Sequence, residues 1–117
     1  MYIGRFAPSP TGPIHFGSLV TAVASYLDAK HHDGIWKIRM EDLDQPRVVE
    51  GSDKAIINSL HQHGFHWDDE IIYQSHRIDT YQTYLSHLNQ QGNTYFCECS
   101  RKEIADSAMT GIDGMIY

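Results

Sequence analysis

A histidine, a glycine and several hydroxyl groups lie in one proline-rich segment near the start of the chain, Pro8-Ser9-Pro10-Thr11-Gly12-Pro13-Ile14-His15-Phe16-Gly17-Ser18. This segment joins an expected strand over residues 2–7 to a helix expected to begin near Ser18. Free N–H groups and the dipole at a helix start suit a phosphate. Gly17 would let a flat ring or a phosphate approach the backbone, and His15 would donate a hydrogen bond as charge develops in a transition state. A rigid proline turn with a surface histidine is the alternative from these residues alone.

Charged side chains lie near the ends of two expected strands. Arg5 is near the end of strand 2–7, and Arg39 and Glu41 are near the end of strand 35–40. With the helix between them these strands form a βαβ unit, so Arg5 and Glu41 are expected close together on the same edge as His15. An arginine binds a carboxylate and a glutamate holds an ammonium group, which suits an amino acid with an acidic side chain. A structural Arg–Glu ion pair explains the same residues equally well.

Helices that position these residues are expected from apolar side chains at helical spacing. The first runs from about Ser18 to His32 and ends before Gly34. Its apolar residues are Leu19, Val20, Val23, Tyr26 and Leu27. The second runs from a Ser52 cap to His63, and its inward residues are expected to be Ala55, Ile56 and Leu60.

The last third of the chain is expected to contain two helices and a strand. A helix over residues 77–91 would end at Gly92, and Thr94–Cys99 reads as a strand. One face of that helix carries Ile78, Tyr81, Leu85 and Leu88. Ser100 with Glu103 resembles a capping box that opens a short helix. The apolar ending Met115-Ile116-Tyr117 is expected of a fragment of a longer protein.

Composition favours one cytoplasmic domain with a modest core. The chain has 117 residues, of which 41% are hydrophobic and 21% charged. No apolar run approaches a membrane span, and the first residues lack the pattern of a secretory signal, so no membrane partner is expected. The formal net charge of −6 argues against nucleic-acid binding through bulk charge, so any RNA contact must rest on specific residues.

Two groups of side chains could hold a metal. Cys97 and Cys99 are expected to be reduced, and on a strand their sulfurs would share one face and could share Zn²⁺. A structural zinc site usually has four ligands, so two packed thiols are the default interpretation. Among the eight histidines, His61 and His63 cannot share a helix face, so solvated or capping roles are expected.

Several motifs occur in the order found in one enzyme family. Residues Arg5–Gly12, followed by His15-Phe16-Gly17, resemble the signature of glutamyl- and glutaminyl-type class I aminoacyl-tRNA synthetases, with Ser18 in place of the final histidine of a His-Ile-Gly-His motif. Residues 39–44 resemble the Arg-x-Glu-Asp-x-Asp of glutamyl enzymes. Further similarities follow at Pro46, Arg47, Trp67-Asp68, Tyr73-Gln74-Ser75-x-Arg77 and Tyr81.

The resemblance implies a fold and a domain division. The fold would be α/β, a partial Rossmann-like class I synthetase catalytic domain with a zinc-binding insertion that begins near residue 95. Residues 1–92 would form the N-terminal half of that domain, and residues 93–117 the start of the insertion. The zinc ligands would be Cys97, Cys99 and Tyr117, with a further cysteine beyond the end of the chain.

The resemblance also implies the residues of the site. The ATP-binding residues would be Pro8, Ser9, Thr11, Gly12, His15, Gly17 and Ser18, with His15 catalytic because it stabilises the pentavalent α-phosphate. The L-glutamate-binding residues would be Arg5, Phe6, Ala7, Pro8, Ser9 and Glu41. Asp42 and Asp44 would be structural.

Residues 16–23 resemble the group of these enzymes that activates glutamate with ATP and Mg²⁺ and transfers it to the queuosine base in the anticodon of tRNA(Asp). The protein would act as a monomer. Three alternatives remain: an ordinary glutamyl-tRNA synthetase, a non-catalytic remnant or binding module, and another nucleotidyl-transferring α/β enzyme. The chain has no Lys-Met-Ser-Lys-Ser-type loop, so the 117 residues alone are expected to be inactive.

Overall fold

A computed structural model describes residues 1–107 of the chain, except for the side chain of Arg101. Its contacts divide the chain into two units, one of residues 1–81 and one that begins at Gln82. The first unit carries the sheet and the sequence motifs. Each unit is described by itself.

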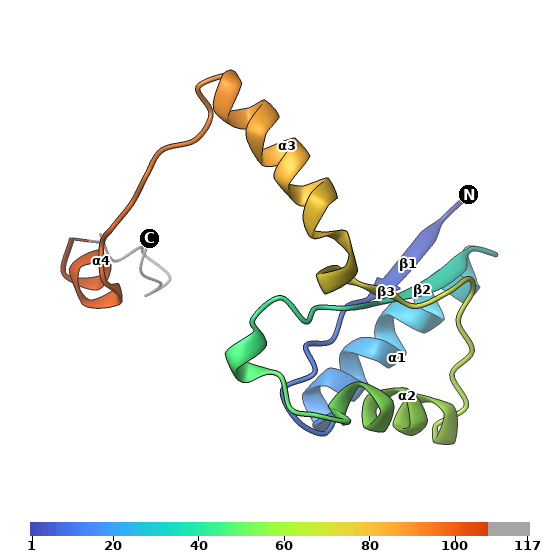
Figure 1. The fold of residues 1–117 in the computed structure, drawn as a ribbon. Helices are drawn as coiled ribbons and strands as arrows, with labels where there is room; N and C mark the ends of the chain where they lie inside the picture. Colours follow the sequence, from blue (N-terminus) through green and yellow to red (C-terminus); the bar gives the residue numbers. More distant parts are fainter. Residues whose placement is uncertain (108–117) are drawn as a thin grey trace. The chain divides into compact units, whose positions relative to one another are not determined.

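The first unit is built on a parallel sheet of three strands, β1 (Ile3–Phe6), β2 (Ile35–Met40) and β3 (Ile72–Tyr73), in the order β1-β2-β3. The helices α1 (Phe16–His31) and α2 (Ser52–Gln62) lie on the same side of this sheet (Figure 1). The first two strands and first helix confirm the predicted βαβ unit. Strand β3 was not predicted, because two residues carry no periodic pattern.

The core lies between the sheet and its two helices. Side chains alternate along β2, so that one face of the strand is buried and the other is half-exposed. The buried residues of the core are Phe6, Ala22, Ala29, Trp36, Ile38, Met40, Ile56, Leu60 and Phe65. Parallel sheets are normally covered on both faces, and here the described residues of the first unit supply two helices to one of them.

Helix α1 confirms the predicted helix and buries small residues. Ala22 and Ala29 are fully buried, whereas Val20, Val23 and Leu27, whose spacing predicted the helix, are 41–59% exposed. The cause is a close approach to β1. A Cβ atom on Gly4 would lie 2.8 Å from the Cβ of Ala29, which leaves room only for alanine on the facing side of the helix.

Helix α2 confirms the predicted inward positions of Ile56 and Leu60, but Ala55 is exposed. Its N-cap is Gly51, which has a φ of 75°, and Ser52 is the first helical residue. The prediction of Ser52 as the cap was therefore wrong. Its hydroxyl has a different partner, which belongs to the candidate site described below.

The remaining elements are helical. A 3₁₀ helix over Gln45–Arg47 follows β2, and another over Gln74–Arg77 leads into α3 (Ile78–Gln90). Helix α4 (Arg101–Ser107) begins with the predicted capping box, in which Ser100 N–H donates to Glu103 Oε2 at 2.7 Å and Glu103 N–H to Ser100 Oγ at 3.3 Å. No helix of residues 1–107 is both long and apolar enough to cross a membrane.

The predicted strand over Thr94–Cys99 was wrong. Residues 93–100 form neither a helix nor a strand. Strand-like side chains do not make a strand without a neighbour to pair its N–H and C=O groups, and the ladders of the described residues involve only β1, β2 and β3. The expected division at residues 92 and 93 stays a prediction.

Asp42 joins the end of β2 to the turn after β3. Its carboxylate is 9% exposed and accepts hydrogen bonds from Ser75 N–H at 2.9 Å and from Ser75 Oγ–H at 2.5 Å. Burial raises the pKa of Asp42, but the two hydrogen bonds from Ser75, together with a backbone hydrogen bond at Asp42 and the nearby His76, hold the pKa below its ordinary 3.8. This geometry agrees with the structural role expected for Asp42.

We predict that Asp42→Asn lowers the unfolding free energy of the chain by about 2 kcal/mol at pH 7, since one Ser75 donor then faces an amide NH₂. A lowered folded-state pKa contributes stability above the unfolded pKa, and this contribution is lost as pH falls through the folded value. The difference between the two proteins should therefore shrink below about pH 3.8. Urea unfolding measures both effects. Asp44→Asn is the matched control, and an equal loss in that exposed position would contradict the assignment.

Candidate active site

A cavity of about 690 Å³ opens where β1 leads through the first loop into α1. It is lined by Arg5, Phe6, Ala7, Pro8, Ser9, Thr11, Gly12, Pro13, Ile14, His15, Ser18, Thr21 and Ile56. No acidic residue is among these lining residues, although the chain as a whole carries a net charge of −6. A cavity that holds a guanidinium and a helix start but no carboxylate suits an anionic ligand.

The cavity gathers most of the predicted site residues. Every residue of the predicted ATP-binding set lines it except Gly17, and every residue of the predicted glutamate-binding set lines it except Glu41. Four lining residues belong to neither predicted set: Pro13 and Ile14 in the first loop, and Thr21 and Ile56, which reach the cavity from α1 and α2. The hydroxyl of Thr21 donates to the carbonyl of Gly17 at 3.0 Å, one helical turn away. No sequence motif marks Thr21 or Ile56 as part of a site.

His15 is the N-cap of α1. Its Nδ1 accepts the N–H of Ser18 at 3.2 Å, and its Nε2 lies 3.0 Å from Ser18 Oγ. An Nδ1 that accepts a hydrogen bond leaves the proton of a neutral imidazole on Nε2. In that tautomer the Nε2–H faces the hydroxyl of Ser18, and the orientation of the ring at the rim of the cavity is set by the helix that it caps.

Gly17 lies against the ring of His15 and does not line the cavity. A Cβ atom at position 17 would lie 3.2 Å from Cε1 and 3.3 Å from Nδ1 of the His15 ring. These distances are shorter than ordinary carbon contacts, so a larger residue here would require the ring to shift by a few tenths of an ångström. The His-x-Gly spacing thus has a local steric reason, which adds to the predicted close approach of a ligand.

The first loop is held by hydrogen bonds to its carbonyl groups. Pro8 and Pro10 have no N–H, and their carbonyls accept the N–H groups of Glu41 and Val49, both at 2.9 Å. Gly12 donates its N–H to Ser52 Oγ at 3.0 Å and accepts the Ser52 hydroxyl at 2.5 Å.

The hydroxyl of Ser52 thereby fastens α2 to the loop. Ser52 is buried, and Gly12 has a φ of 148°, which favours glycine. The backbone of the cavity wall is thus fixed before any ligand arrives. Ser52 has the residue type of a helix cap, and its sequence position gave no signal of this second role.

Glu41 lies beside the cavity wall but pairs with Arg39. Arg39 Nη2 donates to Glu41 Oε1 at 2.6 Å, and both side chains are about one-third exposed. The predicted closeness of Arg5 and Glu41 was wrong in register, since Arg5 lies opposite Lys37. Glu41 comes four positions after Lys37, which in extended chain is a rise of about 13 Å. This separation argues against an Arg5–Glu41 ion pair and leaves room for a small molecule between the two groups.

The described residues do not form a zinc site. Cys97 and Cys99 are both exposed, and the described part of the chain has no group of three or more His, Cys, Asp or Glu residues that could hold a metal. The predicted ligand Tyr117 lies outside the described residues. Two thiols supply half of a four-ligand set. The exposed His63 caps α2, with Nδ1 2.7 Å from the Ser59 carbonyl, and His61 lies against Trp67, as expected for capping or solvated histidines.

The chain is similar over nearly its whole length to curated relatives of one activity. A glutamyl-Q tRNA(Asp) synthetase of Dechloromonas aromatica (strain RCB) is 57% identical over 114 residues, which are 97% of this chain and 38% of that protein. The protein of the same name from Neisseria meningitidis serogroup B (strain ATCC BAA-335 / MC58) is 53% identical over 117 residues, or 100% of this chain and 40% of the relative. The chain thus spans about two fifths of the length of these relatives.

Solved structures share the fold. The crystal structure of glutamate-tRNA synthetase from Elizabethkingia anophelis is 34% identical and has a TM-score of 0.74, with coverage of 89% of this chain and 23% of that one. The parallel sheet, the histidine-capped helix and the cavity thus lie in a part of a class I synthetase catalytic domain. Residues 3–113 match tRNA synthetases class I (E and Q), catalytic domain, and the chain belongs to this family.

We predict that Ser52→Ala loosens the first loop. The variant leaves the N–H and C=O of Gly12 without their partner, so the unfolding free energy should fall by about 1–2 kcal/mol. Amide hydrogen exchange should show faster exchange at Gly12 than in the parent chain. Ser59→Ala removes a hydroxyl from the same helix and is the control. Unchanged exchange at Gly12 would show that Ser52 does not hold the loop.

Proposed function

We propose that this chain supplies the ATP- and glutamate-binding part of an enzyme that activates L-glutamate and transfers it to the queuosine base in the anticodon of tRNA(Asp). The observation that carries the proposal is the acid-free cavity, in which Arg5 and the histidine-capped start of α1 face the same space. Relatives that are 50–57% identical and are named for this activity support it.

In the first step a carboxylate oxygen of glutamate attacks the α-phosphorus of ATP. The bond between the α-phosphorus and the bridging oxygen breaks, which gives glutamyl-adenylate and pyrophosphate. Negative charge grows on the α-phosphate oxygens in the transition state, and the Nε2–H of His15 together with the N–H groups at the start of α1 would stabilise it. Ser9, Thr11 and Gly12 belong to the fixed loop and would position the nucleotide by direct contact.

In the second step a hydroxyl of queuosine attacks the acyl carbon of the adenylate. An ester of glutamate forms, the bond from the acyl carbon to the phosphate oxygen breaks, and the proton of the hydroxyl passes to the departing AMP or to solvent. The chain needs no covalent intermediate on its own residues for either step. Its part is to hold the reactants and to stabilise charge.

The amino-acid part of the site would use both charges of the substrate. Arg5 would bind a carboxylate of glutamate and Glu41 its ammonium group, with Phe6, Ala7, Pro8 and Ser9 forming the wall between them. Mg²⁺ would arrive with the phosphates of ATP, since the cavity lining offers no carboxylate for it. Cys97, Cys99 and Tyr117 would bind Zn²⁺ only with a further ligand, and no step is assigned to that metal.

An ordinary glutamyl-tRNA synthetase is the second candidate. The solved structures support it, because both the Elizabethkingia anophelis enzyme and the glutamate tRNA ligase of Elizabethkingia meningosepticum CCUG26117, at 34% and 33% identity, carry that name. The resemblance of residues 16–23 favours the queuosine enzyme. The two candidates differ in whether glutamate is activated before tRNA binds.

We predict glutamate-dependent exchange of pyrophosphate into ATP without any tRNA. The measurement uses a chimera in which this chain replaces the matching segment of the Dechloromonas aromatica relative, since the chain spans 38% of that protein. Exchange that strictly requires tRNA would favour the ordinary glutamyl enzyme. A folded chimera without exchange under either condition would favour a non-catalytic module.

We predict that His15→Ala in the same chimera lowers the exchange rate by about 10²–10³-fold, the usual effect of losing one donor to a transition-state oxyanion. The loss of the helix cap would also destabilise α1, so His15→Ser separates the two effects. Serine is a good N-cap but is too short to reach the phosphate, and its variant should be stable and slow. His63→Ala is the control on another helix end. Near-normal exchange in His15→Ser would contradict the role of the imidazole.

A further inference from the structure

The ion pair between Arg39 and Glu41 at the end of β2 differs from an ordinary surface ion pair in the hydrogen bonding of its arginine. Arg39 lies on the half-exposed face of β2, opposite the core, and Glu41 follows directly after the end of that strand. Arg39 Nη2 holds Glu41 Oε1 at 2.6 Å. The Nε of Arg39 is buried and has no hydrogen-bond partner in the described part of the chain. In this conformation the guanidinium donates from Nη2 to Glu41, while its Nε–H makes no hydrogen bond.

This arrangement fixes one oxygen of the carboxylate and leaves the other one open. Within residues 1–107, Oε1 is bound by Arg39, and no partner of Oε2 is found. A carboxylate accepts several hydrogen bonds, so Oε2 can still receive an ammonium group. The N–H of Glu41 is bound to the carbonyl of Pro8, which is part of the cavity wall. Backbone and side chain are thus both held beside the site.

The surroundings set the direction in which an amino acid would lie. Arg39 lines a second cavity, of about 260 Å³, together with Arg5, Lys37 and Arg77. Lys37 is paired with Asp69 at 2.7 Å. Arg5 lines both cavities, so carboxylates are drawn toward it, whereas Glu41 is the acceptor placed for a cation.

We propose that Arg39 is a positioning residue, which holds the Glu41 carboxylate ready for the α-ammonium group of the amino-acid substrate. The proposal rests on the proposed function for the identity of that substrate. Arg39 itself does not touch the substrate in this scheme. It removes the rotational freedom of Glu41 before binding, so that less entropy is lost when the ammonium group arrives.

The test compares two ligands in the chimera described above. Glutamate carries the ammonium group, whereas glutarate keeps both carboxylates and lacks it. Arg39→Ala should weaken glutamate binding, measured by calorimetry, about tenfold, and should leave glutarate and ATP binding within about twofold. Arg39→Lys should recover part of the loss, because an ammonium group can still hold one oxygen of Glu41. Lys37→Ala removes a cation from the same strand and face and should leave all three affinities unchanged.

The outcomes separate this proposal from the proposed function. Unchanged glutamate affinity in Arg39→Ala, or an equal loss for glutamate and glutarate, would overturn the positioning role. In variants that still exchange, the loss should appear in the KM for glutamate with kcat nearly unchanged. A chimera that binds glutamate in this Arg39-dependent way but exchanges no pyrophosphate would uphold the positioning role and reject the proposed function.

Discussion

The attachment of the first loop to the rest of the first unit is the interaction on which the site depends. Pro8 and Pro10 have no backbone N–H, so they cannot donate the hydrogen bonds of a strand or a helix interior. Their carbonyls are bound by the backbone of Glu41 and Val49, and Gly12 by the buried hydroxyl of Ser52. The loop is therefore irregular and yet fixed, which is what a site needs if it is to meet a transition state without rearrangement.

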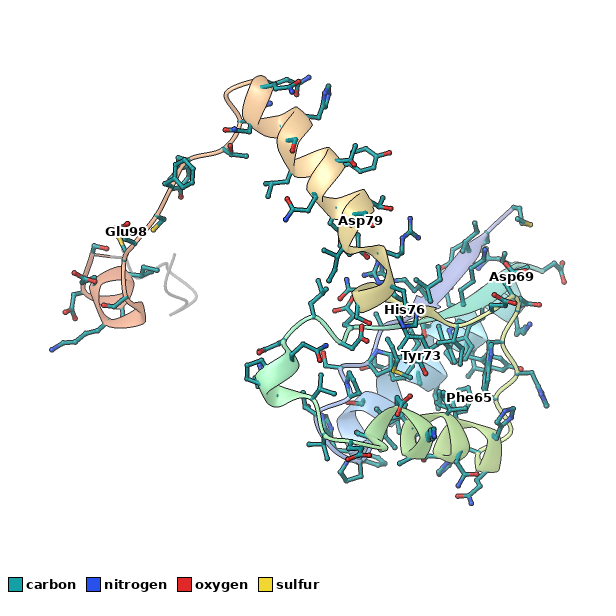
Figure 2. The ribbon with its side chains drawn as sticks, viewed as in Figure 1. Phe65, Asp69, Tyr73, His76, Asp79 and Glu98 are labelled. Atoms are coloured by element: carbon teal, nitrogen blue, oxygen red, sulfur yellow. The ribbon has the colours of Figure 1, made fainter. Side chains whose placement is uncertain are left out.

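Several carboxylates of the first unit accept hydrogen bonds inside the fold, and none of them lines the cavity. Asp42 holds Ser75, Asp68 accepts the N–H of Trp36, and Asp53 accepts the hydroxyl of Tyr73, which extends toward α2 (Figure 2). Burial and the bond to Asp53 raise the pKa of Tyr73 to about 12, so it remains a donor. Acidic side chains thus fasten the first unit and stay out of the cavity lining, and this distribution explains how a chain of net charge −6 can present an anion site.

Sequence predicted what is local and missed what depends on distant contacts. The βαβ unit followed from periodicity. The site residues from Arg5 to Ser18 followed from the resemblance to glutamyl- and glutaminyl-type synthetases, and they adjoin in space because a strand, its loop and its helix start are consecutive. The exposed face of α1 did not follow, because alanine is selected there by Gly4 on another element. The separation of Arg5 and Glu41 depends on strand register, and the role of Ser52 depends on a contact with Gly12, 40 residues away in the sequence.

Ser18, where the related motif has its final histidine, shows how the local geometry accommodates a departure. Its N–H and its hydroxyl both contact the His15 ring, so one residue fixes both ring nitrogens. A phosphate that approaches Nε2 has to share or displace the serine hydroxyl, which is small and free to rotate. The substitution therefore costs the site one possible imidazole donor but keeps the other imidazole aligned by two hydrogen bonds, with Gly17 providing the space beneath it. The segment from His15 to Ser18 thus presents one oriented histidine at the start of a helix.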